Sequence, residues 1–131
     1  MLNHVMIGAS DIKKTKAFYD TVLAVLGARE AFVHTNDTGQ TRLFWSHNGS
    51  TFSVSEPING EPPSVANGMT IGFVCDSPEQ LQLFHDTAIA NGGSLCEEPP
   101  GPRDGSMGLM YLCYFRDPDG HKICGIHRPA K

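Results

Sequence analysis

The hydrophobic positions of this chain follow the same order twice: a short continuous apolar run, and then apolar residues at helical spacing. In the first half, a short apolar run from His4 to Ala9 gives way to a segment in which apolar side chains recur at helical spacing, at Phe18, at Val22 and about one turn further on. This pattern predicts a strand followed by a helix from about residue 11 to residue 26. Ser10-Asp11 can cap the start of this helix, and Gly27 ends it.

The second half repeats this order. Residues 71–75 form another apolar run, and the segment Ser77-Pro78-Glu79-Gln80 combines a capping residue with a proline suited to the first helical turn. Apolar positions at Phe84 and Ala88 then follow helical spacing until Asn91-Gly92-Gly93. We therefore predict a second strand and helix of the same kind.

Two tetrapeptides within the predicted helices show that the halves are related. Phe18-Tyr19-Asp20-Thr21 and Phe84-His85-Asp86-Thr87 match at three of four positions and lie 66 residues apart in a chain of 131. A duplication is the simplest explanation. A closed pair of modules is expected, since two copies are too few for a solenoid, and ligands are commonly bound on the concave faces that paired units share.

Each predicted helix is followed by three strand-like segments. They cover residues 30–35, 41–46 and 50–55 in the first half, and 94–98, 110–116 and 121–126 in the second. Asn48-Gly49 and Asp117-Pro118-Asp119-Gly120 are the corresponding hairpin turns, and aligning their glycines sets Phe44 against Phe115. The prediction is an α+β protein with two tandem β-α-β-β-β modules, at about 1–57 and 69–131, in one domain.

Two polar stretches lie outside the predicted elements. Residues 58–68, rich in Pro, Gly and Asn, are predicted to link the modules. Residues 97–108 are glycine-rich and have no equally long counterpart in the first half, so we expect a loop there that is either functional or disordered.

Composition and charge narrow the function classes. The chain is 40% hydrophobic and 18% charged, with a net charge of -4 and no basic stripe, so we expect no nucleic-acid or membrane partner. It contains no apolar run of about 20 residues, and its first residues are unlike a signal peptide, which predicts a cytoplasmic protein. Its four cysteines, without CxxC spacing, are expected to be reduced thiols.

Several of these segments resemble those of a known superfamily. They are His4 to Ile7, Ser10-Asp11 before Ala17 to Asp20, Leu26-Gly27, and above all Tyr114 to Ile123. Together with the duplication, they are similar to the vicinal oxygen chelate proteins, which include glyoxalase I, extradiol dioxygenases, fosfomycin-resistance enzymes and bleomycin-binding proteins. The resemblance implies a cup-shaped, partly open mixed sheet that binds a small molecule. One fold hosts many chemistries, however, so the activity has to be argued from the site.

The resemblance also implies which four positions would hold a divalent metal in relatives that bind one. Here they are His4 and Thr70, which open the first strand of each module, and Ser53 and Cys124 in the last strands. Neutral hydroxyl groups are poor ligands for such ions, so we favour a pocket without metal and leave the cofactor unknown.

The same residues have alternative interpretations. His4 is either a general base or ligand contact, or a strand histidine satisfied by a hydroxyl group of Thr70 or Ser53. Cys124 is either a nucleophile activated by His4 or a packing residue. Trp45 and Tyr114 face the cup if Phe44 and Phe115 pack under the helices; otherwise they fill the core.

Arg103 lies in the predicted loop 97–108. It either closes over the cup and pairs with a ligand carboxylate or phosphate, or is simply solvated. Three functions stay open for the chain: a lyase- or dioxygenase-like enzyme, a protein that binds an aromatic or drug-like compound without catalysis, and a partner protein with a vestigial cup. Because each module has open sheet edges, we also predict a homodimer.

Overall fold

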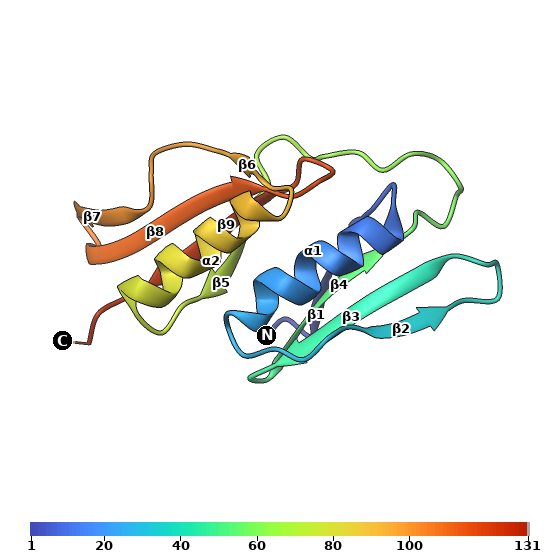
Figure 1. Cartoon of the computed structure of the whole chain (residues 1–131), viewed down its shortest axis with the longest axis horizontal. Helices are drawn as coiled ribbons and strands as arrows, with labels where there is room; N and C mark the ends of the chain where they lie inside the picture. The colour runs from blue at the N-terminus through green and yellow to red at the C-terminus, as the bar shows by residue number, and fades with distance from the viewer. Residues whose placement is uncertain (131) are drawn as a thin grey trace.

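The computed structural model describes residues 1–130, which form two helices and nine strands (Figure 1). In chain order these are β1 (His4–Gly8), α1 (Ile12–Ala24), β2 (Phe32–Thr35), β3 (Thr41–His47), β4 (Ser50–Ser55), β5 (Ile71–Val74), α2 (Pro78–Ala90), β6 (Ser94–Leu95), β7 (Gly101–Gly105), β8 (Gly108–Arg116) and β9 (Lys122–His127).

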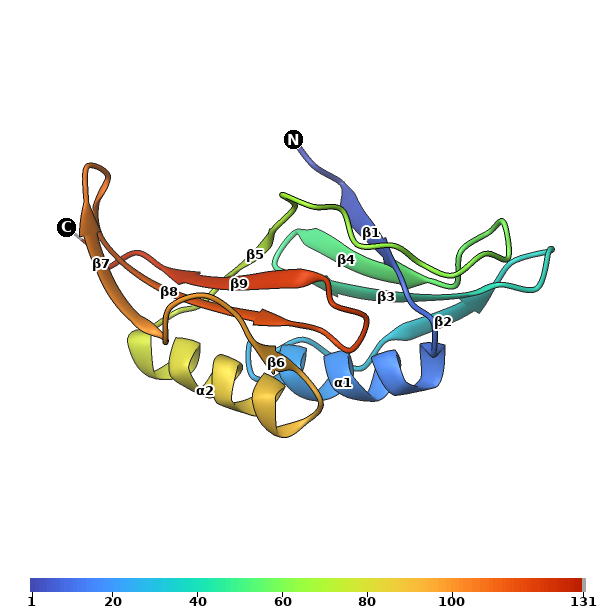
Figure 2. The ribbon, with the colours of Figure 1, turned by 90° about the horizontal axis from the view of Figure 1, so that it is seen from above.

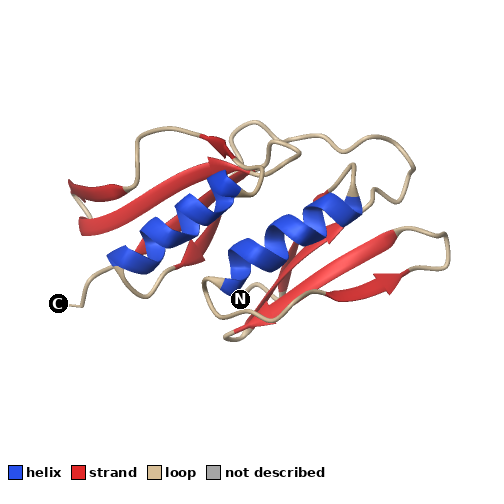
Figure 3. Cartoon of the chain, in the orientation of Figure 1, coloured by secondary structure: helices blue, strands red, loops and turns tan. Residues whose placement is uncertain are grey.

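The strands form two separate mixed sheets, one in each module (Figure 3). The first has the order β1-β4-β3-β2, and the second has the order β5-β9-β8-β6 with β7 also paired to β8. In each module the first strand is parallel to the last, and the other pairs are antiparallel. The predicted α+β fold with two β-α-β-β-β modules is therefore confirmed.

Both helices begin at the predicted capping residues. The Asp11 side chain accepts a hydrogen bond from the Lys14 amide, and Ser77 does the same for Gln80. Helix α1 ends at Ala24, earlier than predicted, because the amide of Gly27 bonds back to the Ala24 carbonyl in a tighter turn. None of the helices in residues 1–130 is long and apolar enough to cross a membrane.

Helices α1 and α2 lie side by side on the same face of the two sheets (Figure 2). The core continues from one module to the other through two aromatic pairs. The ring centroids of Phe18 and Phe115 are 6.2 Å apart, and those of Phe52 and Phe73 are 5.2 Å apart. The modules are thus joined by a shared hydrophobic core.

The other face of each sheet carries no helix. In the first module the linker lies against this open face, because a Cβ atom at Gly8 would meet the Cβ of Pro63 at 2.8 Å and the Cγ of Pro57 at 3.6 Å. Figure 2 shows this segment, in green, on the side of the sheet away from α1. The linker therefore covers part of the surface that the sequence suggested as a cup.

The two hairpins of the duplicated modules differ in turn length. In β3 and β4, Phe44 pairs with Ser53, whereas Tyr114 pairs with Cys124 in β8 and β9. Counted from these pairs, the second turn is one residue longer, so Trp45 corresponds to Phe115. Aligning Phe44 with Phe115 was wrong by this one residue.

The side-chain directions follow from that register. Trp45 is 3% exposed and packs under α1, while Phe44 lies on the open face. Of the two alternatives for Trp45, the structure therefore has the one in which this side chain fills the core. In the second module Phe115 is buried under α2, so the neighbouring Tyr114 lies on the open face of its sheet.

The segment 97–108 also differs from the prediction. It contains β7, which pairs with β8 from Gly101↔Leu112 to Gly105↔Gly108 and forms a hairpin arm at the end of the second module (Figure 2). Glycine and proline have low strand propensity, which concealed this strand in the sequence.

Candidate ligand site between the modules

The interface between the modules has two ends, because related turns of the two copies lie at opposite sides of it (Figure 1). At the end that we call the closed end, the β8–β9 turn packs on the first module. The hydroxyl of Tyr19 in α1 donates a 2.7 Å hydrogen bond to the Asp117 carboxylate, which also accepts bonds from the amides of Asp119 and His121, each at 3.0 Å. The three hydrogen bonds that this carboxylate accepts thus come from its own turn and from the other module.

Two further contacts complete the closed end. The hydroxyl of Ser10 donates to the Asp119 carboxylate at 2.6 Å, and Nε2 of His121 donates to the Gly8 carbonyl at 2.7 Å. These bonds attach the turn to the end of β1 and the start of α1. The closed end is therefore sealed by polar contacts that cross between modules.

Burial affects the two central groups of this network. It raises the pKa of the Asp117 carboxyl in spite of the hydrogen bonds, which act in the opposite direction. Burial, reinforced by the negative charge of Asp117, raises the pKa of Tyr19 well above its usual value. Tyr19 thus remains a neutral hydrogen-bond donor over the physiological pH range.

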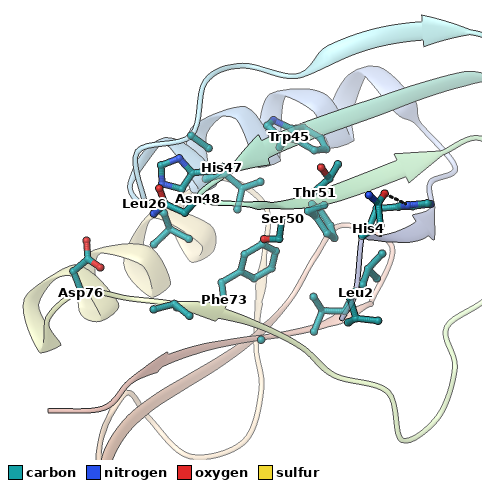
Figure 4. Close-up of a pocket in the computed structure, with 18 residues that line it drawn as sticks. Leu2, His4, Leu26, Trp45, His47, Asn48, Ser50, Thr51, Phe73 and Asp76 are labelled. Carbon is teal, nitrogen blue, oxygen red and sulfur yellow. Dashed lines mark hydrogen bonds between the residues drawn. The ribbon is translucent and has the colours of Figure 1, made fainter. Parts of the chain in front are cut away.

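The opposite end, which we call the open end, is built from the corresponding residues of the other copy. By strand register, His47 corresponds to Asp117, Val74 to Gly8 and Asp76 to Ser10. Here the turn does not seal the interface. Instead these three residues line a crevice of about 310 Å³ between the modules (Figure 4).

The walls of the crevice are mainly apolar. Trp45 and Phe52 are stacked with ring centroids 5.8 Å apart, and Phe73 from the second module meets Phe52 edge to face. Leu26 lies at the end of the crevice beneath α1 (Figure 4). A volume of about 310 Å³ with aromatic walls suits a small, flat, apolar ligand.

Trp45 is held firmly in this wall. Its indole nitrogen donates a 3.0 Å hydrogen bond to the Asp20 carboxylate, which also accepts from the Ala31 amide and from Lys16. Burial favours a higher pKa for Asp20, but these hydrogen bonds outweigh it and hold the pKa below its usual value. The indole face that lines the crevice is thus preorganised.

Polar groups lie along the mouth of the crevice, with His4 at one end and Asp76 at the other (Figure 4). They include His4, His47, Asn48, Thr51 and Asp76. A second, shallower hollow of about 980 Å³ on the open face of the first sheet shares several of these residues and adds others, among them Arg29, Glu30, Phe32 and Phe44. The mouth of the crevice therefore continues onto the open face of the first module.

Two of the residues predicted for the site line the crevice. His4 is exposed at its mouth, with Nδ1 2.9 Å from Oδ1 of Asn3, and Trp45 forms part of its wall. Neither hydroxyl expected beside His4 is bonded to it among the described residues. Ser53 is fully buried and donates to the Val5 carbonyl at 2.7 Å, and Thr70 is exposed just before β5.

Three other predicted residues lie on the second module. Tyr114 and Cys124 are paired neighbours on the open face of its sheet, and the Lys122 amine lies 4.8 Å from the Tyr114 ring centroid. Arg103 is in β7, and its guanidinium donates to the carbonyls of Gly101, Pro102 and Pro99. This group is separate from the residues that line the crevice.

The residues at the four metal positions of the superfamily do not fit a metal. Ser53 already donates its hydroxyl hydrogen to a backbone carbonyl. Burial raises the pKa of the Cys124 thiol, opposing a hydrogen bond from Tyr114 that lowers it, so the thiolate that a metal requires is disfavoured. Within residues 1–130, no three His, Cys, Asp or Glu side chains are grouped as a metal centre requires.

The comparisons with known proteins agree with this architecture. Residues 1–124 match the Glyoxalase/Bleomycin resistance protein/Dioxygenase superfamily, and the chain belongs to this family. A glyoxalase/bleomycin resistance protein from Albidiferax ferrireducens T118 is 48% identical, with a TM-score of 0.89 over 98% of this chain and 99% of that one. Among proteins with curated functions, none matches.

More distant structures share the fold alone. A glyoxalase-related enzyme from Fulvimarina pelagi is 19% identical, with a TM-score of 0.71 over 98% of this chain and 88% of that one. A glyoxalase I mutant from Zea mays is 16% identical, with a TM-score of 0.67 over 96% of this chain, which spans only 45% of the maize chain.

Most crevice residues were missed by the sequence analysis. Leu26 was one of two candidates, with Val25, for the last apolar position of the first helix. Phe52 and Phe73 lie within predicted strands, so nothing distinguished these residues from ordinary core residues. The available indication was the difference between the two turns, Ser46 to Gly49 against Arg116 to Gly120, whose unequal lengths imply unequal contacts with the neighbouring module.

Proposed function

We propose that this protein binds a small apolar or aromatic compound in the crevice at the open end of the module interface, without metal chemistry. The best support for this proposal is the difference between the two ends of the module interface. One is sealed by the Asp117 turn, and the other retains a space of about 310 Å³ with aromatic walls. Such a space matches the size and lining of small-molecule sites.

The catalytic alternative, a lyase- or dioxygenase-like enzyme, has less support from the site. His4 and Cys124 lie in different sheets, and among the described residues no hydrogen bond joins them. Burial raises the pKa of the Cys124 thiol, which disfavours a nucleophilic role. An exposed imidazole at His4 remains chemically able to accept a proton from a ligand bound at the mouth.

Fluorescence of Trp45 tests the binding proposal directly, because it is the single tryptophan of the chain. A flat aromatic compound such as quinoline or naphthol should change its emission on titration, since Trp45 lines the crevice. If a panel of such compounds leaves both the emission and the melting temperature unchanged, the proposal fails.

A matched pair of variants locates the binding site. Ala28 lines the crevice, whereas Ala24 at the end of α1 is exposed and lies outside it. Ala28→Phe should fill part of the space and weaken binding, and Ala24→Phe should leave binding unchanged while adding the same side chain. Equal affinities for the two variants would place the ligand elsewhere.

The metal question needs its own measurement. We expect purified protein to lack stoichiometric divalent metal by elemental analysis, since Ser53 and Thr70 offer only hydroxyl groups. Stoichiometric metal that is lost in both His4→Ala and Cys124→Ala would contradict the proposal and favour the enzyme.

We also propose that the protein is a homodimer. Strand β2 is paired on one side only within residues 1–130, and its apolar side chains Phe32 and Val33 are 68% and 47% exposed. Unpaired edges of this kind favour pairing with another chain. A monomer mass at micromolar concentration in gel filtration with light scattering would contradict this.

A further inference from the structure

The crevice has a charge pattern that selects among small molecules. Its lining, all within the described residues, contains no lysine and no arginine, and its single carboxylate is that of Asp76. A ligand that carries a carboxylate or phosphate would find no permanent cation there, while a ligand that carries a protonated amine would find a counterion.

The Asp76 carboxylate is available for such a contact. It lies directly after β5, at the end of the crevice where Figure 4 also shows Leu26 and Asn48. Within residues 1–130, the hydrogen bond made by this residue is through its backbone amide to Oε1 of Gln80, and its side chain takes part in no hydrogen bond or ion pair. The position of Asp76 therefore leaves both carboxylate oxygens free to accept.

At the closed end, the residue that corresponds to Asp76 has a hydrogen-bond partner from the other module. Ser10, the counterpart of Asp76, donates to the Asp119 carboxylate of the turn from the other module. At the open end the turn offers His47 and Asn48 instead, and neither bonds Asp76 among the described residues. Asp76 thus lacks the bond to the other module that Ser10 makes, and it lies next to an apolar space.

We infer that the crevice selects an aromatic or apolar amine, whose ring lies against Phe52 and Phe73 and whose ammonium group donates to Asp76. This inference rests on the proposed function, because it assigns a ligand class to the same crevice. The aromatic walls supply affinity for the ring, and they also favour a nearby cation through their π faces.

Three probes that share a phenyl ring and a two-carbon spacer test the inference: 2-phenylethylamine, 2-phenylethanol and 3-phenylpropanoate, titrated by isothermal calorimetry at pH 7 and low salt. The amine should bind about fivefold more tightly than the alcohol, as expected for an exposed ion pair, and the carboxylate should bind most weakly. Added salt should reduce the preference for the amine.

Asp76→Asn keeps the shape of the side chain and removes its charge. In this variant the amine should bind only as well as the alcohol, and affinity for the alcohol should not change. Asp37→Asn, in an exposed turn of the first module, is the control for the same change in net charge and should bind all three probes as the wild type does.

The outcomes separate this inference from the proposed function. Equal affinities for amine and alcohol in the wild type, no binding of the amine at millimolar concentration, or an equal loss for both probes in Asp76→Asn would overturn the inference. If alcohol binding is nevertheless lost in Ala28→Phe, the crevice remains the site. If Ala28→Phe binds both probes normally, the proposed function fails as well.

Discussion

The two ends of the module interface use the same positions of a duplicated unit in opposite ways. At the closed end, Asp117 and Asp119 of one turn bind Tyr19 and Ser10 of the other module. At the open end, the corresponding turn has His47 in place of Asp117. No such hydrogen bonds are formed there among the described residues, and a crevice lies between the modules. The difference shows that a duplication can keep its backbone plan while polar side chains seal one end and leave the other accessible.

The repeated tetrapeptides of the two helices differ in the same way, since only one of them makes a hydrogen bond between the modules. Tyr19 and His85 occupy equivalent places, and both are buried. Tyr19 donates to Asp117 across the interface, whereas Nδ1 of His85 has no hydrogen-bond partner within residues 1–130 and lies 3.6 Å from the Asp86 carboxylate. One substitution in a four-residue motif thus separates a contact between modules from a side chain that packs against Phe115 of its own module.

Removing the central carboxylate of the closed end should have the largest effect on stability. Asp117→Ala leaves the buried Tyr19 hydroxyl and the amides of Asp119 and His121 without their acceptor. We expect the free energy of unfolding to fall by about 3 kcal/mol or more, measured by urea denaturation.

His47→Ala is the matched change at the open end. His47 is only partly buried and has no side-chain hydrogen bond within residues 1–130, so its loss should change the free energy of unfolding by no more than about 0.5 kcal/mol. Similar losses in the two variants would contradict the contrast between the ends.

The cores of the modules should differ in their tolerance of an added methyl group. Gly125 of β9 corresponds to the buried Val54 of β4, but a Cβ atom at Gly125 would lie 2.7 Å from the Cys113 sulfur and 3.1 Å from a ring carbon of Phe84. Gly125→Ala should therefore destabilise the protein by about 1–3 kcal/mol.

Gly72 of β5 provides the control, because a Cβ atom there would meet nothing within 4 Å. Gly72→Ala should be neutral or slightly stabilising in the same thermal and urea unfolding measurements. A destabilisation equal to that of Gly125→Ala would show that the close contact at Gly125 is not the cause.

Alkaline pH should lower the free energy of unfolding because of buried thiols in the second module, which contains all four cysteines. Burial raises the pKa of both Cys75 and Cys113 to about 12, from an ordinary value of 9.0. Between these values the unfolded chain loses thiol protons that the folded chain keeps, so stability falls as the pH rises. Each thiol should contribute about 1 kcal/mol per pH unit from roughly pH 9 upward.

The slope of stability against pH, measured by urea unfolding between pH 8.5 and 10.5, checks this prediction. Cys113→Ala also creates a small cavity, which lowers stability at every pH, but it should make the alkaline slope shallower. An unchanged slope would mean that Cys113 does not titrate as the structure implies.

Local sequence patterns were sufficient for the fold. The caps at Asp11 and Ser77, the helical spacing around Phe18 and Phe84, and the Asn48-Gly49 turn act over a few residues, and each is found in the structure where it was predicted. The duplication then supplied the pairing of the modules, because each half had to form the same sheet.

The site depended on features that local patterns do not contain. The sequence left the orientation of Trp45 open, because one additional residue in the second turn shifts the alignment of the strands and so reverses the face that Phe44 is given. The crevice arises only where modules pack, and the sequence does not encode the position of Asp76 against Leu26 as a local pattern.

The extra residue in the β8–β9 turn also has an evolutionary consequence. Turns tolerate insertions and deletions better than strands do, so a single codon gained or lost there would alter how an interface end is filled without disturbing the sheet. After duplication, the two copies were free to diverge at their turns. Descendants of such a gene could open or close a binding space through turn length alone, while Phe18 and Phe84 kept the helices in place.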